Sequence, residues 1–384
     1  MDNNEVIKLI NIKNEKKISS GFCSHEPNKM IILSLIIITS IQFCVIYILI
    51  FKSKINNNFD NFDNHDANQI KERLFLFKGD DKIHIETNKT KIEIVMSIDN
   101  SGAFISLVSI TSALENNNHN KNILIYHLLL SHDFQMEKIE YFESLKEKYD
   151  FRINYYKIPN IFNNYKKWRF SSTIYYKLLI PIIFPDYERI IFLDADTLIL
   201  KDISEMYSLP FNDNYVLGYP FHTPWMVTIN RKHPKIYINS GVLLINIKKI
   251  RKENQDFKLI QFTSKYSKKL FFPEQDAMNY IFYKKMGILP LKYGIYLYGN
   301  ITEYKKKYSV KLKIKLNLKE LEKAIEDPSI VHLCCCNPKV WYNKTKHEHR
   351  FHHICKRFQK EFYFYANKTK YYDKIYNRYM KKKN

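Results

Sequence analysis

Two aspartates, Asp194 and Asp196, follow a short apolar run in the stretch RIIFLDADTLILKD. Isolated charges are costly to bury unless they are paired or coordinated, so these carboxylates need a partner. Residues two apart in an extended chain point the same way, and both carboxylates can therefore converge on one point. Hard oxygen ligands suit Mg²⁺ or Mn²⁺, which complete their shells with phosphate oxygens and water. The alternative is a turn or helix-capping role at a strand end.

Strand-like and helix-like segments alternate on both sides of this pair. We expect helices over residues 102–115, 133–149 and 171–184, and strands over residues 91–98, 122–130, 151–158 and 189–193. Such alternation predicts an α/β fold with a largely parallel sheet. Ligands of these sheets bind at the carboxyl ends of the strands. Asp99 ends the first strand and Asp194 follows the fourth, so both fall at the expected edge.

The composition places few limits on function. The chain has 384 residues, of which 45% are hydrophobic, and Lys+Arg 61 against Asp+Glu 39 gives a net charge of +22. A basic chain suggests an anionic partner, but the lysines are spread along the sequence rather than gathered on one stretch. No nucleic-acid recognition motif appears, so we expect no nucleic-acid partner.

The segment from Met30 to Phe51 carries no charged residue. A membrane-spanning helix needs about 20 mostly apolar residues, and this run is too long and too late for a signal peptide. Five lysines lie in the segment before it, whereas after it Lys52 and Lys54 are followed by Asn and Asp, which predicts a cytosolic N-terminus. We therefore expect a cytosolic tail over 1–29, a transmembrane anchor over 30–51, an Asn/Asp-rich stem over 52–88 and a folded domain over 89–384.

Four glycosylation sequons agree with a lumenal domain; they begin at Asn88, Asn300, Asn343 and Asn367. The C-terminal Lys381–Asn384 looks like a dilysine retrieval signal, but such signals are bound in the cytosol. With a lumenal C-terminus, a solvated lysine tail is the preferred interpretation.

The segment FLDADTLIL resembles the Asp-x-Asp region of glycosyltransferase family 8, the retaining UDP-sugar transferases related to glycogenin and to lipopolysaccharide galactosyl- and glucosyltransferases. Further segments match the family in order: IVMSIDNSGAFISLVSITSALENN, SSTIYYKLLIP, YINSGVLLINIKKIR, PEQDAMNYIF, VHLCCCNPKVW and FYFYANKTKYYDKIY. The resemblance covers about residues 92–376. It implies a single GT-A type nucleotide-sugar transferase domain over 89–384, with a mixed, mostly parallel sheet flanked by helices.

The resemblance also implies roles for individual residues. Asp194, Asp196 and His332 would bind a divalent metal, and a histidine ligand favours Mn²⁺ over Mg²⁺, although Mg²⁺ stays possible. Asp99 would lie beside the nucleoside, and Lys339 would reach the diphosphate. The other residues expected to contact the donor are Ser97, Lys177, Asp194, Asn239, Glu274 and Gln275, of which Asn239, Glu274 and Gln275 would face the sugar as catalytic residues.

Four positions depart from the family pattern, and the first is Lys177, where the family usually has Arg. Glu274 stands where Asp is usual, and Cys335 stands where relatives have a glycine. Lys339 comes seven residues after His332 rather than six, so the loop must bulge or shift.

Two clusters of metal-ligand residue types need an interpretation. For Cys334–Cys336 we prefer packed cysteines, or a disulfide to Cys355 in an oxidising lumen, over thiolate ligation of a metal. The segment HEHRFHH, residues 347–353, fails the His-Glu-x-x-His test for zinc because Phe351 takes the second histidine's place. We expect it to form a polar surface turn or a helix start.

The expected reaction is transfer of a hexose or pentose from a UDP-sugar to a hydroxyl of a glycan, glycoprotein or other acceptor, with retention, in the Golgi or endoplasmic reticulum membrane. Gln275 is a weak nucleophile, which favours departure and attack on the same face of the sugar. One alternative is a lumenal sugar-nucleotide or glycan-binding protein with a decayed site. Another is a haloacid-dehalogenase-type phosphatase, disfavoured because Thr197 follows Asp196 without a glycine.

Overall fold

The computed structural model describes residues 75–79, 88–165, 171–221, 237–296, 318–336, 339–343 and 353–381, all of which belong to one compact unit, Asp63–Asn384. The predicted cytosolic tail and the predicted anchor over 30–51 lie outside these residues. Within the described ranges, no helix is both long and apolar enough to cross a membrane.

The main sheet has eight strands in the order β1-β4-β3-β2-β5-β8-β7-β9. Four of its seven pairings are parallel and three are antiparallel, so the sheet is mixed and mostly parallel. Its strands are β1 (Phe75–Gly79), β2 (Thr90–Ile98), β3 (Asn122–Leu130), β4 (Arg152–Lys157), β5 (Arg189–Leu193), β7 (Val216–Pro220), β8 (Ile238–Asn246) and β9 (Met286–Ile288). Because β1 pairs with β4, the sheet starts earlier in the chain than the boundary predicted at residue 89.

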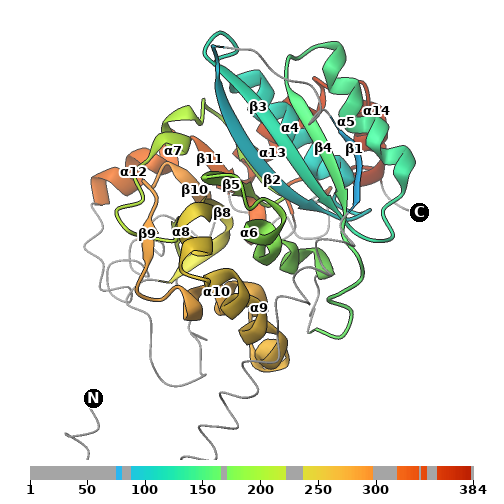
Figure 1. Ribbon diagram of the computed structural model, residues 1–384. Coiled ribbons are helices and arrows are strands. Elements are labelled where there is room, and N and C mark those ends of the chain that lie inside the picture. The colour runs from blue at the N-terminus through green and yellow to red at the C-terminus, as the bar shows by residue number, and fades with distance from the viewer. Residues whose placement is uncertain are drawn as a thin grey trace, which may run out of the picture. The chain divides into compact units, whose positions relative to one another are not determined.

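Helices gather in two groups beside this sheet. Those beside β2, β3 and β4 are α4 (Ala103–Asn116), α5 (Ile139–Glu143), α13 (His353–Ala366) and α14 (Tyr372–Tyr379), as Figure 1 shows. Those nearer β5 and β8 are α6 (Ile180–Ile183), α8 (Ile247–Lys252), α9 (Gln255–Tyr266) and α10 (Pro273–Ile281). Two further helices, α7 (Ser204–Ser208) and α12 (Leu318–Glu326), lie near the second, smaller sheet.

The smaller sheet brings the C-terminal third of the domain to the aspartate pair. It has the order β10-β11-β6, formed by β10 (Tyr293–Tyr296), β11 (Ile330–His332) and β6 (Thr197–Ile199). β6 begins directly after Asp196, and β11 pairs with it antiparallel, so that His332 lies opposite Thr197. This pairing carries His332 to the aspartates from a distant part of the sequence.

The predicted strands agree closely with the structure, but two predicted helices do not. Residues 133–149 form a 3₁₀ turn over Met136–Lys138, the short helix α5 and a second 3₁₀ turn over Ser144–Glu147. The Ser144 hydroxyl donates to the carbonyl of Tyr141 at 2.7 Å, a local bond that competes with a continuous α-helix.

The second correction concerns residues 171–184, where a 3₁₀ helix covers Ser172–Leu179 and only α6 is α-helical. Pro181 has no N–H to donate to the carbonyl of Lys177, so an α-helix cannot run through this point. The N–H of Ile180 donates to that carbonyl instead, three residues on.

Candidate active site

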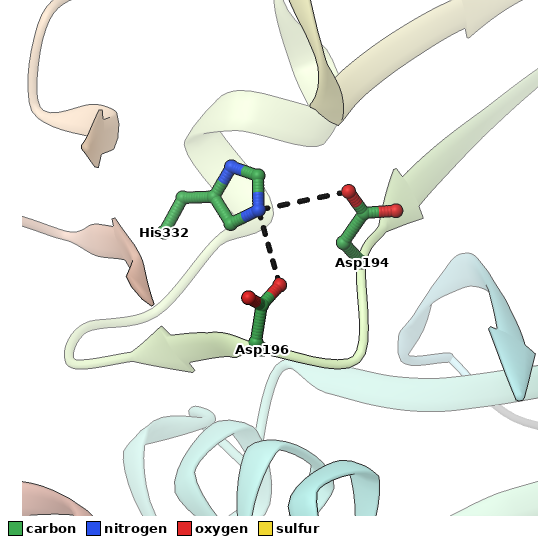
Figure 2. A group of neighbouring side chains, drawn as sticks. All are labelled: Asp194, Asp196 and His332. Carbon is green, nitrogen blue, oxygen red and sulfur yellow. Dashed lines mark hydrogen bonds and ion pairs between the residues drawn. The ribbon is translucent and has the colours of Figure 1, made fainter. Parts of the chain in front are cut away.

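Asp194, Asp196 and His332 converge on one point, as Figure 2 shows. The His332 Nε2 lies 3.1 Å from Asp196 Oδ1 and 3.6 Å from Asp194 Oδ2. One potential ligand atom from each residue lies within 4.8 Å of the other two. The two carboxylates suit Mn²⁺ or Mg²⁺, and the imidazole favours Mn²⁺.

Gly241 in β8 leaves room for this convergence. Its carbonyl accepts a hydrogen bond of 2.7 Å from the N–H of Asp194, which holds the two strands together at the site. A Cβ at position 241 would lie 2.6 Å from Asp194 Oδ2 and would collide with the His332 ring. Glycine inside a strand often marks such a close approach. The cradle therefore exists only because residue 241 has no side chain, and the residues around it fit a divalent ion.

Asn239 fixes the orientation of the His332 ring. Its Oδ1 lies 3.1 Å from His332 Nδ1 and also accepts the N–H of Gly241 at 2.8 Å. An amide oxygen only accepts, so Nδ1 carries the hydrogen of this bond. In the neutral ring, Nε2 then keeps its lone pair and faces the carboxylates, the arrangement found around histidine metal ligands.

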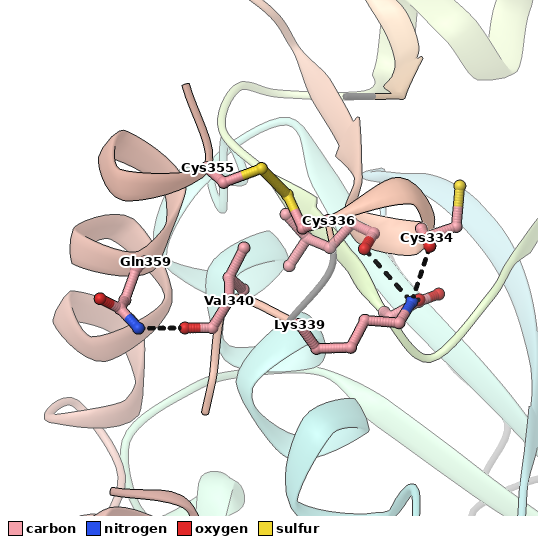
Figure 3. The surroundings of a disulfide bond; sticks show 8 residues. Cys334, Cys336, Lys339, Val340, Cys355 and Gln359 are labelled. Atoms are coloured by element: carbon pink, nitrogen blue, oxygen red, sulfur yellow. Dashed lines mark hydrogen bonds and ion pairs between the residues drawn. A yellow bond between two sulfur atoms is a disulfide. The ribbon is translucent and has the colours of Figure 1, made fainter. Parts of the chain in front are cut away.

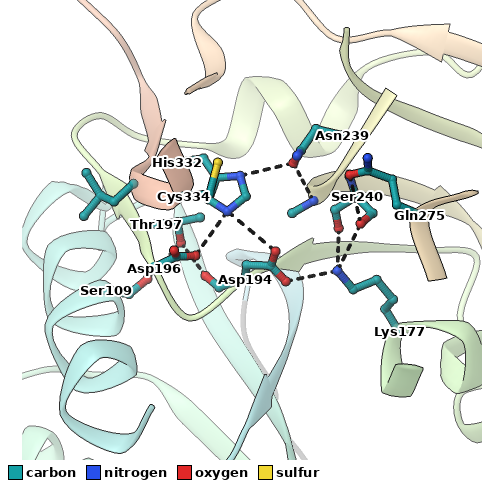
Figure 4. A network of polar contacts seen from close by, with 12 residues as sticks. Ser109, Lys177, Asp194, Asp196, Thr197, Asn239, Ser240, Gln275, His332 and Cys334 are labelled. Atoms are coloured by element: carbon teal, nitrogen blue, oxygen red, sulfur yellow. Dashed lines mark hydrogen bonds and ion pairs between the residues drawn. The ribbon is translucent and has the colours of Figure 1, made fainter. Parts of the chain in front are cut away.

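Each aspartate also contacts one lysine, as Figure 4 shows for the first of them. The Lys177 Nζ lies 3.1 Å from Asp194 Oδ1 and donates to the Ser240 carbonyl at 3.0 Å. The Lys339 Nζ lies 2.8 Å from Asp196 Oδ2. Lys339 therefore reaches the site despite the extra residue after His332.

The pKa values of three side chains follow from this arrangement. Burial works against the ionised form of Asp196, yet the Lys339 ammonium and the His332 ring hold the pKa of that carboxyl well below its usual range. Burial also lowers the pKa of His332, but Cys334 and Asp196 outweigh it, and the net pKa is well above the ordinary value. Burial raises the pKa of Glu274, against the opposing charge of Lys177.

Gln275 and Glu274, at the start of α10, meet β8 at Ser240. The Gln275 side chain accepts from the N–H of Ser240 at 3.0 Å and donates to the Tyr237 hydroxyl at 3.0 Å, so both ends of its amide bind protein groups. Glu274 Oε1 lies 3.4 Å from the Ser240 hydroxyl. Ser240 thus links Lys177 to both α10 residues. The sequence analysis did not select Ser240, although its position between Asn239 and Gly241 could have indicated a place in the site.

Asp99 and Ser97 lie at the end of β2. Asp99 Oδ1 accepts from the N–H groups of Ser101 and Gly102, both at 2.9 Å, and so shapes the turn before α4. A Cβ at Gly102 would lie 3.8 Å from that of Ala195, so this turn adjoins the aspartate pair. The Ser97 hydroxyl is buried and makes no hydrogen bond with the described residues. Both residues are therefore at the edge where the donor was predicted to bind.

A disulfide fastens the segment that carries His332 and Lys339. Cys336 bonds to Cys355 in α13, with 6.2 Å between their Cα atoms, as Figure 3 shows. This confirms the disulfide alternative predicted for the cysteine cluster. Cys334 is not disulfide-bonded, and the Cys335 side chain lies outside the described part of the chain. Of residues 347–353, only His353 is described, and it begins α13.

The model of glycosyl transferase family 8 matches residues 93–345. The chain belongs to glycosyl transferase family 8. Family 8 enzymes are glycosyltransferases. The resemblance predicted from the sequence motifs is confirmed, and the match favours glycosyl transfer over the phosphatase alternative.

Two curated relatives illustrate the family. General stress protein A of Bacillus subtilis is 30% identical over 48% of this chain and 65% of its own length. Lipopolysaccharide 1,2-glucosyltransferase of Escherichia coli is 30% identical over 55% of this chain and 64% of its own length. The chain thus spans just under two thirds of the length of each.

Solved structures agree on the fold. The galactosyltransferase LgtC, in complex with donor and acceptor sugar analogs, superimposes with a TM-score of 0.59 at 18% identity, over 73% of this chain and 96% of that chain. The bifunctional glycosyltransferase WbbM gives a TM-score of 0.59 at 19% identity, over 77% of this chain and 53% of that chain. The α/β fold with its mixed sheet is therefore of the GT-A kind.

Proposed function

We propose that this family 8 enzyme transfers a hexose or pentose from a UDP-sugar to an acceptor hydroxyl, with retention, and that it depends on Mn²⁺ or Mg²⁺. The observation that carries the proposal is the convergence of Asp194, Asp196 and His332, whose ligand atoms lie within 4.8 Å of one another. Asn239 supports it by presenting His332 Nε2 to the two carboxylates.

The residues around the triad have separate tasks. A divalent ion bound to Asp194, Asp196 and His332 would supply Lewis-acid stabilisation of the charge on the departing diphosphate. Lys177 holds the Asp194 carboxylate in place by binding its other oxygen. Lys339 provides a positive charge at the edge of the triad, where a developing negative charge can be stabilised electrostatically.

The sugar-facing residues support same-face departure and attack. Gln275 uses both ends of its amide to bind Ser240 in β8 and Tyr237 just before that strand, which argues against a covalent intermediate on that side chain. Glu274 is the carboxyl next to Lys177 and Ser240, and it could stabilise an oxocarbenium-like ring or hold its hydroxyls. We assign Ser97 and Asp99 to the nucleoside end of the donor, because the turn after Asp99 adjoins the aspartate pair.

A donor screen tests the proposal. The purified full-length protein is incubated with Mn²⁺ and a panel of UDP-sugars, and UDP release is measured with and without candidate acceptors. One donor should give Mn²⁺-dependent release, which Asp194→Ala and Asp196→Ala should abolish. Asp186→Ala, at an exposed carboxylate outside the site, is the matched control and should behave like wild type. Metal and UDP binding without turnover of any donor would instead support the decayed binding protein.

We also propose a type II topology, with residues 30–51 as the anchor and the catalytic domain in the lumen of the Golgi or endoplasmic reticulum. The charge asymmetry around the anchor supports this orientation. Asn88 and Asn367, the first residues of two sequons, are exposed, and the Cys336–Cys355 disulfide suits an oxidising compartment.

Endoglycosidase treatment of the protein expressed in eukaryotic cells tests this topology. The enzyme should increase gel mobility, and Asn88→Gln with Asn367→Gln should reduce that shift. Complete digestion of the domain by protease added to intact microsomes would refute the orientation.

A further inference from the structure

The Lys339 ammonium occupies a position made of three oxygen acceptors. Its Nζ lies 2.8 Å from Asp196 Oδ2, 3.0 Å from the Cys334 carbonyl and 3.3 Å from the Leu333 carbonyl, and Figure 3 shows the two carbonyl contacts. Carboxylate and carbonyl oxygens are also the ligands that divalent cations such as Mg²⁺ prefer. A lysine and a metal ion therefore have the same carboxylate, Asp196, as a partner.

The two lysines of the site differ in how firmly they are held. The Lys177 side chain is 2% exposed, and its Nζ lies over the Phe192 ring at 4.7 Å. Moving its charge would require reorganisation of the core. The Lys339 side chain is 32% exposed, and its Nζ lies 5.5 Å from the Trp341 ring at the edge of the site. Its flexible stem can therefore move the ammonium group at small cost.

We propose that Lys339 is a tethered counter-ion that competes with the divalent cation for Asp196 until the donor binds, and then transfers its contact to the donor's diphosphate. A metal ion and an ammonium group that share one carboxylate repel each other, and this repulsion weakens metal binding in the donor-free protein. A diphosphate offers Lys339 a second anionic partner and relieves the repulsion. The second step rests on the proposed function, whereas the competition itself does not.

This arrangement makes metal and donor bind cooperatively. If UDP raises the affinity for Mn²⁺, then Mn²⁺ must raise the affinity for UDP by the same factor. Lys339 contributes to that factor because its repulsion of a bound metal ion is relieved only when UDP is bound as well. The sign of the effect separates this role from a supporting one. A lysine that merely supported the site would weaken Mn²⁺ binding when removed, whereas a competitor strengthens it.

Mn²⁺ binding to the full-length protein, measured by calorimetry or by the electron paramagnetic resonance signal of free Mn²⁺, tests the inference. Lys339→Met should bind Mn²⁺ about tenfold more tightly than wild type without UDP, because one nearby positive charge is gone. UDP should bind Mn²⁺-saturated Lys339→Met about tenfold more weakly, since a charge-assisted hydrogen bond is lost. Lys339→Arg keeps the charge and should restore weak Mn²⁺ binding.

Lys370→Met is the matched control, since this lysine pairs with Glu147 at 2.8 Å on the surface, away from the site. It should match wild type in both titrations. If Lys339→Met keeps the wild-type thermal transition and binds Mn²⁺ no more tightly, the inference is overturned. If Lys339→Met does not fold, Lys339→Gln replaces it, and this variant should also bind Mn²⁺ more tightly than wild type. A wild-type protein in which UDP does not change the affinity for Mn²⁺ would overturn the inference as well.

Turnover of UDP-sugars is a separate measurement. Tighter Mn²⁺ binding by Lys339→Met in a protein that turns over no donor would uphold the competition and reject the proposed function. Normal turnover by wild type, with unchanged Mn²⁺ affinity in Lys339→Met, would reject the competition and uphold the proposed function.

Discussion

Replacement of Gly241 by alanine should disrupt the metal site without removing any ligand. The new methyl carbon would lie 2.6 Å from Asp194 Oδ2, and real Cβ contacts are essentially never below 3.0 Å. The carboxylate must therefore retreat by at least about 0.4 Å, the difference between these two distances. The His332 ring must move as well. Lys177 restrains the aspartate at 3.1 Å and Asn239 restrains the histidine at 3.1 Å, so neither can move freely.

The size of the effect follows from these restraints. Overpacking of this kind typically costs about 1–3 kcal/mol, which should appear as a lower free energy of unfolding in urea. Displacement of two of the three ligands should weaken Mn²⁺ binding by about 10–100-fold, the range seen when residues that orient ligands are lost. UDP release from the donor identified in the screen should fall in parallel at fixed Mn²⁺ and partly recover at high Mn²⁺.

Gly102→Ala provides the matched control at the same edge of the sheet. The nearest atom to its new Cβ, Asp99 Oδ1, lies 3.6 Å away, an ordinary van der Waals distance. Its stability should change by no more than about 0.5 kcal/mol, and its Mn²⁺ affinity should match wild type. A Gly241→Ala protein with wild-type Mn²⁺ affinity and turnover would refute the steric account of the site.

Three further predictions concern charge and covalent bonding. Lys177→Met leaves Asp194 without its ammonium partner and should lower the free energy of unfolding in urea by about 2 kcal/mol. This loss is smaller than for a fully buried ion pair because the Asp194 side chain is 32% exposed. An unchanged free energy of unfolding would contradict the positioning role of Lys177. In metal-free protein the raised pKa of His332 stabilises the fold fully below about pH 6.5, and this contribution is lost as the pH rises through the folded-state value. The free energy of unfolding should therefore decline in wild type as the pH rises above about 6.5, and decline less in His332→Gln. Equal slopes of unfolding free energy against pH in the two proteins would refute this. Cys355→Ser opens the disulfide between residues 19 apart and should cost about 3 kcal/mol by chemical denaturation, whereas a loss below about 1 kcal/mol would show that the bond adds little.

Local patterns in the sequence predicted the buried strands of the main sheet. The strand predicted over 122–130 has the bounds of β3, and the strand predicted over 189–193 has those of β5. Apolar runs of this kind carry their own signal because both faces of the strand are buried. The 3₁₀ helix over Ser172–Leu179 was not predicted, because its apolar spacing resembles that of an α-helix and Pro181 decides the outcome.

The ligand residues were predictable, and their supports were not. Asp194 and Asp196 share a face by their spacing alone, whereas His332 was assigned by resemblance. The role of Gly241 depends on a side chain that meets it from β11, and the Lys339 contact depends on the path of the loop after His332. These contacts join segments that no local pattern connects, so only the three-dimensional structure shows them.

The antiparallel pairing of β11 with β6 also determines when the site can form during synthesis. Asp196 and His332 are 136 residues apart, and Asp196 and Lys339 are 143 apart. A ribosome releases the chain from its N-terminus, so Asp196 emerges long before the histidine and the lysine that neutralise it. Closing so long a loop carries an entropy cost that must be met before its contacts form. Until β11 docks, Asp196 lacks both its histidine and its lysine, and the last third of the domain is what converts an acidic strand end into a binding centre.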